Sequence, residues 1–356
     1  MNYSSKEIGL IVLSAFPELT YAVKKIMLSD FAEEADFEKQ RDFLIKTLSR
    51  GVYNKLRADF YDPKFRENVL AGLEKKGIKC VTYFSEDYPE NLKNTHIPPI
   101  VLYCRGDTSL LKSSCFAVVG SRRTSPKMLA ECSKISGQLS KKFTVVSGIA
   151  EGADTAALQG ALEAGGKVIS VLANGLDKAY PACNRALQSE IAEKGLLVTE
   201  YLPEELPKPY NFPVRNRIIA GLSAGTLVVS AGLKSGALIT AGYAMEYGRD
   251  VYAFPYNAGS YSGEGCNALI KKGAYLTENI LDILPEFGLD LNTPEKNPLT
   301  QTESEVLEAI RELGEAFVPA VAERTGRLPH EIIPVLCSLQ IKKRIVGLGG
   351  NRYSAI

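Results

Sequence analysis

The sequence predicts an α/β protein built around a doubly wound, mostly parallel β-sheet. Two observations support this fold class. Between residues 116 and 285, short runs of purely apolar residues alternate with segments of helical periodicity. Strands that are apolar along their whole length are typical of a parallel sheet covered by helices on both faces. The hydrophobic fraction of 45% is also high enough for a sizeable folded core.

Apolar runs mark the strands, and each run ends in small or polar residues. In chain order the runs are FAVVG, FTVVSG, KVISVLANG, LLVTEY, TLVVSAG, DVYAFP and AYLTEN. Helical patterns lie between them, namely DTAALQGALEAG, NRALQSEIAEKG, NRIIAGLS, ALITAGYAMEYG and NALIKKG. The helix before these opens at Ser125-Pro126, where serine can cap and proline suits the first turn.

The remaining segments predict smaller parts on either side of this domain. Residues 1–75 show the spacing of helices and carry no evident chemistry. Two β-like runs upstream of Phe116 extend the α/β domain to residues 76–287, and the polar, proline-containing residues 288–300 are typical of a linker. Residues 301–356 combine three helical patterns with a terminal Gly-rich hairpin, which resembles a winged helix.

Composition excludes several classes of function. The chain has 42 basic and 41 acidic residues, so a site for a polyanion must be a local concentration of Lys and Arg. Seven cysteines without a CxxC pair, and only two histidines, argue against a disulfide framework, a metal site and a His-based triad. The apolar run from Ile8 to Phe16 is too short to span a bilayer and lacks the features of a cleaved leader. We therefore expect a cytoplasmic protein without metal, cofactor or membrane association.

Unusual residues collect in the loops that follow the predicted strands. These loops are 120–123, 148–154, 174–181, 210–217 and 234–237. Ligands of open α/β sheets bind beyond the carboxyl ends of the strands, so the loops are expected to converge on one edge. A single arginine is ordinarily solvated surface charge, but basic residues in four such loops indicate a site.

The residue types in these loops suit a phosphate-bearing polymer. Arg122, Arg215 and Arg217 offer permanent charge with bidentate geometry for phosphate oxygens. Phe212 and Tyr180 offer faces on which a base can stack, although Tyr180 can equally pack beneath its neighbouring proline. Glycines at the turns allow the backbone to approach a ligand closely.

Motifs of catalysis are missing from the same loops. GSRRTSP is not GxGxxG, and the sequence has no GxxxxGK[ST], GxSxG or HExxH. Asp154 and Asp177 are better interpreted as anchors at helix N-termini than as catalytic acids. No nucleophile with a neighbouring base is evident, so we expect a binding protein rather than an enzyme.

Six motifs, in order, carry a resemblance to a known family. VVGSRRTSP, VVSGIAEGADTAAL, VLANGLDKAYPACN, NFPVRNRIIAGLS, SGALITAGYAMEYGRDVYAFP and GCNALIKKGA together resemble the DprA/Smf family of DNA-processing proteins of natural transformation. The resemblance implies an extended Rossmann-like domain between a helical (SAM-like) N-terminal domain and a winged-helix-like C-terminal domain. It also implies a homodimer that binds single-stranded DNA without sequence specificity, protects it and loads a RecA-type recombinase while single-strand-binding protein is displaced.

The resemblance assigns DNA-binding roles to particular residues of this chain. By motif position they are Ser121, Arg122, Gly148, Lys178, Asn211, Phe212, Arg215 and Arg217. The helix after NFPVRNR is expected to begin near Asn216, with one of the two arginines either on phosphate or in an ion pair that shapes the pocket. The chain departs from the family pattern at Leu158, Ser230 and Tyr256.

Two other functions remain open at this stage. The first is a nucleotide-binding enzyme on a related fold, such as a phosphoribohydrolase, although the PGGxGT loop of those enzymes is missing. The second is duplex binding by the C-terminal winged helix, whose basic residues Lys342, Lys343 and Arg344 come late, beside the wing.

Overall fold

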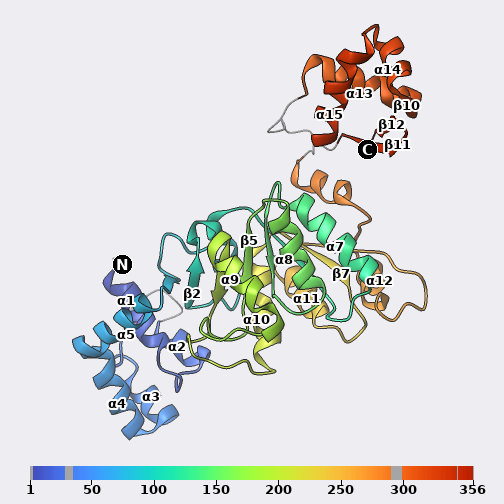
Figure 1. Cartoon of the computed structure of the whole chain (residues 1–356). Coiled ribbons are helices and arrows are strands. Elements are labelled where there is room, and N and C mark those ends of the chain that lie inside the picture. The colour runs from blue at the N-terminus through green and yellow to red at the C-terminus, as the bar shows by residue number, and fades with distance from the viewer. Residues whose placement is uncertain (1–2, 29–34, 290–298, 343, 356) are drawn as a thin grey trace. The chain divides into compact units, whose positions relative to one another are not determined.

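The computed structural model describes residues 3–28, 35–289, 299–342 and 344–355 (Figure 1). Its internal contacts divide the chain into two compact units, Met1–Phe287 and Gly288–Ile356. Most of the predicted linker lies outside the described residues. The predicted boundary between residues 75 and 76 falls inside the first unit and stays a prediction.

A mixed sheet forms the centre of the first unit. Its strands are β1 (Lys79–Thr82), β2 (Val101–Gly106), β3 (Cys115–Gly120), β4 (Thr144–Ser147), β5 (Val168–Val171), β6 (Leu196–Thr199), β7 (Gly225–Ser230), β8 (Asp250–Ala253) and β9 (Tyr275–Leu276). Within the described residues the sheet has nine strands in the order β1-β2-β6-β5-β4-β3-β7-β8-β9. All neighbours from β6 to β9 are parallel, whereas β1–β2 and β2–β6 are antiparallel. The predicted fold class is confirmed.

The order of the strands reverses between β3 and β7. The chain first adds β4, β5 and β6 on one side of β3, and then crosses back to place β7 on its other side. Helices after neighbouring strands leave in opposite directions at such a point, so a crevice opens beyond the strand ends. In the ladder between β3 and β7, the register shifts between Val119 and Gly120 of β3. This irregularity lies at the point where the strand order reverses.

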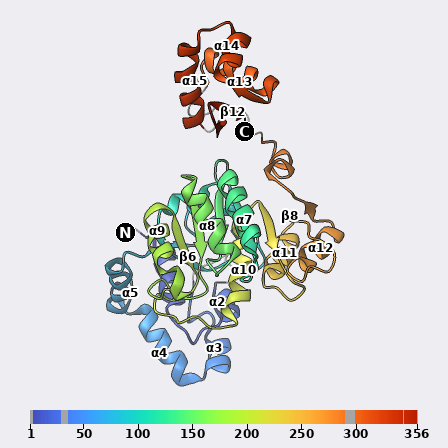
Figure 2. The same cartoon turned by 45° about the vertical axis from the view of Figure 1, so that its right-hand side comes forward.

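Helices cover both faces of the sheet. They are α6 (Glu90–Lys93), α7 (Pro126–Leu139), α8 (Ala153–Glu163), α9 (Arg185–Lys194), α10 (Asn211–Leu222), α11 (Ala237–Glu246) and α12 (Glu264–Lys271). Helices α7, α8 and α9 lie side by side (Figure 1 and Figure 2). Right-handed crossovers place them on one face and α10 to α12 on the other. On the second face, Ile218, Ala241 and Leu269 pack into a core with the strands.

The start of α10 corrects one prediction. The helix begins at Asn211 and not near Asn216, so the whole NFPVRNR segment is helical. Pro213 is compatible with this because the first turn of a helix needs no backbone N–H donor from it. The Asn211 side chain donates to the carbonyl of Ala173 after β5, at 3.1 Å, and fixes where the helix starts.

Residues before the sheet are helical, as their spacing predicts. The helices are α1 (Ser5–Ser14), α2 (Tyr21–Met27), α3 (Arg41–Leu48), α4 (Arg50–Tyr61) and α5 (Pro63–Lys75). Ser4 and Glu7 form a capping box on α1, and Asp62 caps α5 through two backbone N–H groups. Phe37 lies in the centre of an aromatic cluster that includes Tyr53 and Phe60.

The second unit contains helices and a small antiparallel sheet. Its elements are α13 (Gln301–Leu313), β10 (Glu315–Phe317), α14 (Val318–Thr325), α15 (Pro329–Ile341), β11 (Ile345–Gly349) and β12 (Arg352–Ala355). The predicted terminal hairpin is present as β11 and β12, and β10 adds a third strand on the other side of β12. The name winged helix for this unit stays a prediction.

Two further properties of the described residues concern the length of their helices and the state of their cysteines. None of their helices is both long and apolar enough to cross a bilayer. The cysteines are free, and only Cys183 and Cys337 are exposed, whereas Cys80, Cys104, Cys115, Cys132 and Cys266 are buried.

Candidate nucleic-acid interface

A crevice of about 610 Å³ opens where the strand order reverses. Its walls come from the loop after β3, the first turns of α10, the loop after β7, and the turn before α12. A smaller hollow of about 70 Å³ adjoins it beside Tyr180, and Arg122, Phe212 and Arg215 line both spaces. The sequence-based expectation that separate loops converge at this edge of the sheet is confirmed.

The residues assigned from the family motifs fall into two groups. Ser121, Arg122, Gly148, Phe212 and Arg215 line the crevice or the smaller hollow. Lys178, Asn211 and Arg217 line neither space. The four basic residues of the assigned set differ in burial. Arg122 and Lys178 are exposed, whereas Arg215 and Arg217 are buried.

Exposed cations form what we call the rim of the crevice, which consists of Arg122, Arg123 and Lys234. The guanidinium carbon of Arg122 lies 5.5 Å from the centroid of the Phe212 ring, within range of a cation–π contact. The Phe212 ring in turn lies 5.5 Å from the Tyr180 ring at 57°. The rim therefore combines exposed positive charge with an aromatic face.

The loop that carries Arg122 is tied to the end of β7. The Ser121 N–H donates to the Ser230 carbonyl at 2.9 Å and also approaches the Ser230 hydroxyl at 3.1 Å. The Thr124 hydroxyl shares a hydrogen bond of 2.6 Å with that same hydroxyl and donates to the Ser121 carbonyl at 2.8 Å. Ser230, one of the departures from the family pattern, thus helps to position the rim. A buried serine at a strand end gives no sequence signal for this role.

The other two departures lie outside the crevice. Leu158 is fully buried in α8 and lines neither space. The hydroxyl of Tyr256 donates to the Val229 carbonyl at 2.8 Å, and its backbone N–H and carbonyl both bond to the amide of Asn267. Tyr256 therefore closes the β8–α12 loop onto β7.

Arg215 and Asp154 form what we call the floor of the crevice. Arg215 is 4% exposed, and its Nη1 donates to the carbonyls of Gly148, at 2.8 Å, and Val171. Asp154, in the first turn of α8, is 6% exposed and accepts a hydrogen bond from the Ala150 N–H at 3.3 Å. Burial lowers the pKa of Arg215 to about 10, and the charge of Asp154 opposes this effect. Burial likewise raises the pKa of Asp154, against the attraction of Arg215.

Gly148 is required between these two side chains. A Cβ atom at this position would lie 2.5 Å from Nη2 of Arg215 and 2.8 Å from Oδ2 of Asp154. Both distances are far shorter than a van der Waals contact, so any larger residue would displace the floor. Because Gly148 has no side chain, there is room for the buried Arg215 guanidinium in the floor of the crevice.

Arg217 is a buried residue of α10 that does not line the crevice. It is 3% exposed, and its Nη2 pairs with the carboxylate of Glu200. Its Nε and Nη1 have no hydrogen-bond acceptor among the described residues. An ion pair was one of the two expectations for these arginines, and Arg217 forms one with Glu200. That this ion pair shapes the pocket stays a prediction.

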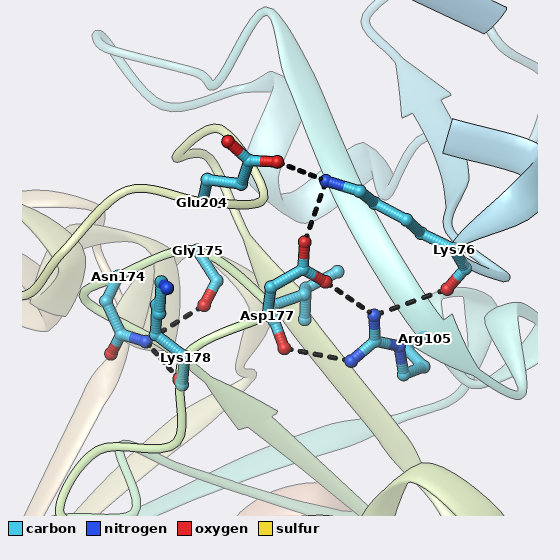
Figure 3. A network of polar contacts seen from close by, with 8 residues as sticks. Lys76, Arg105, Asn174, Gly175, Asp177, Lys178 and Glu204 are labelled. Carbon is cyan, nitrogen blue, oxygen red and sulfur yellow. Dashed lines mark hydrogen bonds and ion pairs between the residues drawn. The ribbon is translucent and has the colours of Figure 1, made fainter. Parts of the chain in front are cut away.

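Lys178 lies on a loop that is anchored to the residue after α5 and to strand β2 (Figure 3). Asp177 pairs with Lys76, at 2.9 Å, and with Arg105, at 3.1 Å. Burial opposes ionisation of Asp177, but the hydrogen bonds from these two cations lower its pKa. The Asn174 side chain donates to the Lys178 carbonyl at 2.6 Å and fixes the other side of the loop. The interpretation of Asp177 as a helix N-terminal anchor is wrong, because Asp177 pairs with Lys76, the residue after α5, and with Arg105 of β2.

Comparison with known proteins agrees with this architecture. A family model described as DNA recombination-mediator protein A matches residues 79–288. DNA processing protein DprA of Streptococcus pneumoniae is 44% identical over 200 residues, which cover 56% of this chain and 71% of that protein. Protein Smf of Escherichia coli K12 is 36% identical over 303 residues, which cover 80% of this chain and 79% of that protein.

Two solved structures have the same fold. The crystal structure of S. pneumoniae DprA aligns with a TM-score of 0.68 and 34% identity, and the alignment covers 82% of this chain and 100% of that one. DNA processing protein A of Helicobacter pylori, whose structure is described as giving its single-stranded-DNA binding mode, aligns with a TM-score of 0.54 and 31% identity, over 59% of this chain and 95% of that one. The chain belongs to the DprA/Smf family of DNA-processing proteins.

Proposed function

We propose that this protein binds single-stranded DNA in the crevice without sequence preference, protects it and delivers it to a RecA-type recombinase. The observation that carries the proposal is the rim, where exposed Arg122, Arg123 and Lys234 border the same crevice as Phe212. The H. pylori relative, whose described activity is single-stranded-DNA binding, supports the choice of ligand.

Chemistry of the rim explains the expected lack of sequence preference. Guanidinium and ammonium groups bind phosphate oxygens, which are the same at every nucleotide. The Phe212 ring can stack under any base because every base has a π-face. These contacts recognise a flexible strand with unstacked bases and do not read base edges.

The family-assigned residues are proposed to have two different roles. Ser121, Arg122, Phe212 and Lys178 are proposed to contact the strand, because they are at least partly exposed. The remaining assigned residues, Gly148, Asn211, Arg215 and Arg217, are proposed to shape the site from below, since they are buried or, for Gly148, lie against the buried Arg215 and Asp154 side chains.

Fluorescence anisotropy with labelled oligonucleotides tests the DNA-binding proposal. Single strands of different base composition are expected to bind with similar affinity and more tightly than a duplex of the same length. Binding that weakens steeply with salt is expected as well, because phosphate contacts release counterions. Preference for the duplex, or calorimetric binding of a mononucleotide without oligonucleotide binding, would overturn the proposal in favour of the alternatives left open by the sequence.

Recombinase loading and dimerisation are tested separately. Addition of this protein is expected to speed filament assembly by a RecA-type recombinase on DNA coated with single-strand-binding protein. If assembly is unchanged while DNA binding is intact, the loading role is wrong and the binding role stands. Light scattering of the purified chain is expected to give the mass of a homodimer, and the cytoplasm is the proposed location.

A further inference from the structure

Tyr261 is a large aromatic side chain left 79% exposed on a wall of the crevice. It belongs to the turn before α12, whereas Phe212 borders the crevice from α10. Lys234, a rim cation, lines the crevice together with Tyr261. Single exposed aromatic residues are common on protein surfaces, so exposure alone says little. What distinguishes this one is that it lines the proposed DNA crevice, as the cation Lys234 also does.

The backbone that carries Tyr261 is held in place from both sides. The Gly263 N–H donates to the Ser260 carbonyl at 2.9 Å, which closes a turn around Tyr261. On the inner side, a Cβ atom on Gly232 would lie 3.1 Å from the Tyr261 carbonyl oxygen and 3.7 Å from its ring. The turn and the ring therefore lie close against the backbone that leaves β7.

Tyr256 fixes the other side of the turn. A Cβ atom on Gly263 would lie 1.9 Å from the Tyr256 ring, so the ring packs directly against the end of the turn. The Tyr256 hydroxyl is bonded to the Val229 carbonyl of β7, so this ring is itself anchored to the sheet. An exposed aromatic ring on a pre-ordered turn loses little conformational freedom when it binds a ligand.

We infer that Tyr261 and Lys234 form a second nucleotide subsite, in which a base stacks on the Tyr261 ring and a phosphate contacts the Lys234 ammonium. The inference rests on the proposed function and extends it. One strand crosses the point where the sheet order reverses, from Phe212 and Arg122 on one wall to Tyr261 and Lys234 on the other. Tyr256 acts as a positioning residue for this subsite.

Substitution of Tyr261 tests the subsite directly. Tyr261→Ala is expected to weaken binding of oligothymidylate by about 5- to 160-fold, the range for loss of one stacked base, while Tyr261→Phe keeps affinity within about twofold. Tyr210→Ala is the matched control, because Tyr210 is 64% exposed but does not line the crevice. An oligonucleotide that contains iodouracil is expected to photo-crosslink to Tyr261.

The outcomes separate this inference from the proposed function. If the unchanged protein binds no single-stranded DNA, the proposed function fails. If it binds and Arg122→Ala weakens binding, but Tyr261→Ala has no effect and no crosslink forms at Tyr261, only the second subsite is wrong. An equal loss in Tyr210→Ala would also overturn it, since position in the crevice would then be irrelevant.

The positioning role of Tyr256 has its own readout. Tyr256→Gly is expected to weaken binding in the otherwise unchanged protein, and to add no further loss in a Tyr261→Ala background, because both changes remove the same stacked base. Additive losses would show that Tyr256 acts on binding by another route, and the positioning role would be wrong.

Discussion

The rim and the floor of the crevice each contain an arginine, but the two side chains differ in their surroundings and therefore in their proposed roles. Arg122 on the rim is exposed and has no ion pair within the part of the chain that the structure describes. Arg215 in the floor is buried, donates to two backbone carbonyls and faces the charge of Asp154. Positive charge available to a ligand therefore comes from the rim, while the floor holds strand ends and α10 in register.

The largest expected effect is loss of stability when the floor is broken. Arg215→Ala leaves the Gly148 and Val171 carbonyls without their donor and Asp154 without a compensating charge. Leaving a buried charge uncompensated costs about 3–5 kcal/mol in the free energy of unfolding. Urea unfolding followed by circular dichroism measures it.

A rim variant and a double variant provide the controls for the floor. Arg122→Ala should change the free energy of unfolding by no more than about 0.5 kcal/mol, as is usual for surface sites. Arg215→Met combined with Asp154→Asn should lose less than the sum of the two single changes, because no buried charge is left behind. If Arg215→Ala unfolds like the unchanged protein and loses only DNA affinity, the distinction between rim and floor is wrong.

The next effect is loss of affinity when the rim is changed. Arg122→Glu should weaken single-strand binding for every base composition. The slope of log affinity against log salt should fall by about 0.7 for each phosphate group that the variant no longer neutralises. Anisotropy titrations over a range of salt concentrations measure both quantities.

Lys141 offers a matched control for the rim. It is exposed and follows α7, just before the start of β4, at the opposite edge of the sheet from the crevice. Lys141→Glu makes the same kind of change in charge away from the rim, so its salt slope should stay close to that of the unchanged protein. Equal slopes in the two variants would contradict a localised phosphate site.

The smallest expected effect comes from removing the second unit. Deletion of residues 290–356 should leave single-strand affinity nearly unchanged, because every residue that lines the crevice belongs to the first unit. A large loss of single-strand affinity, or the loss of a duplex-binding activity, would indicate that the DNA site lies in the C-terminal unit.

Sequence alone predicted the sheet and the convergence of its loops, because apolar strands and glycine-rich turns are local patterns. It did not predict which arginines are buried. That depends on acidic partners far along the chain: Asp154 for Arg215 and Glu200 for Arg217. The expected helix start near Asn216 was also too late. A helix that begins at Asn211 places Asn211 and Arg215 one turn apart on the same face, and the later start did not reveal this arrangement.

Two residues without a local pattern received no positioning or binding role from the sequence, although Ser230 was noted as a departure from the family pattern. Ser230 positions the rim through a hydroxyl that any strand residue could carry, and only its neighbours Ser121 and Thr124 give it a role. Tyr261 stands in an irregular turn, where neither periodicity nor spacing indicates a function. Both depend on contacts between β7 and loops that are remote in sequence.

The distribution of cysteines provides a route to spectroscopic labelling. Burial raises the pKa of Cys80, Cys132 and Cys266 to about 12, so these thiols are poor nucleophiles for maleimide reagents. Exposed Cys183 lies 3.6 Å from the carboxylate of Glu151, a residue that lines the smaller hollow beside the crevice. In a Cys337→Ser background, a fluorophore on Cys183 would become a reporter at the edge of the proposed DNA site, without any engineered attachment point.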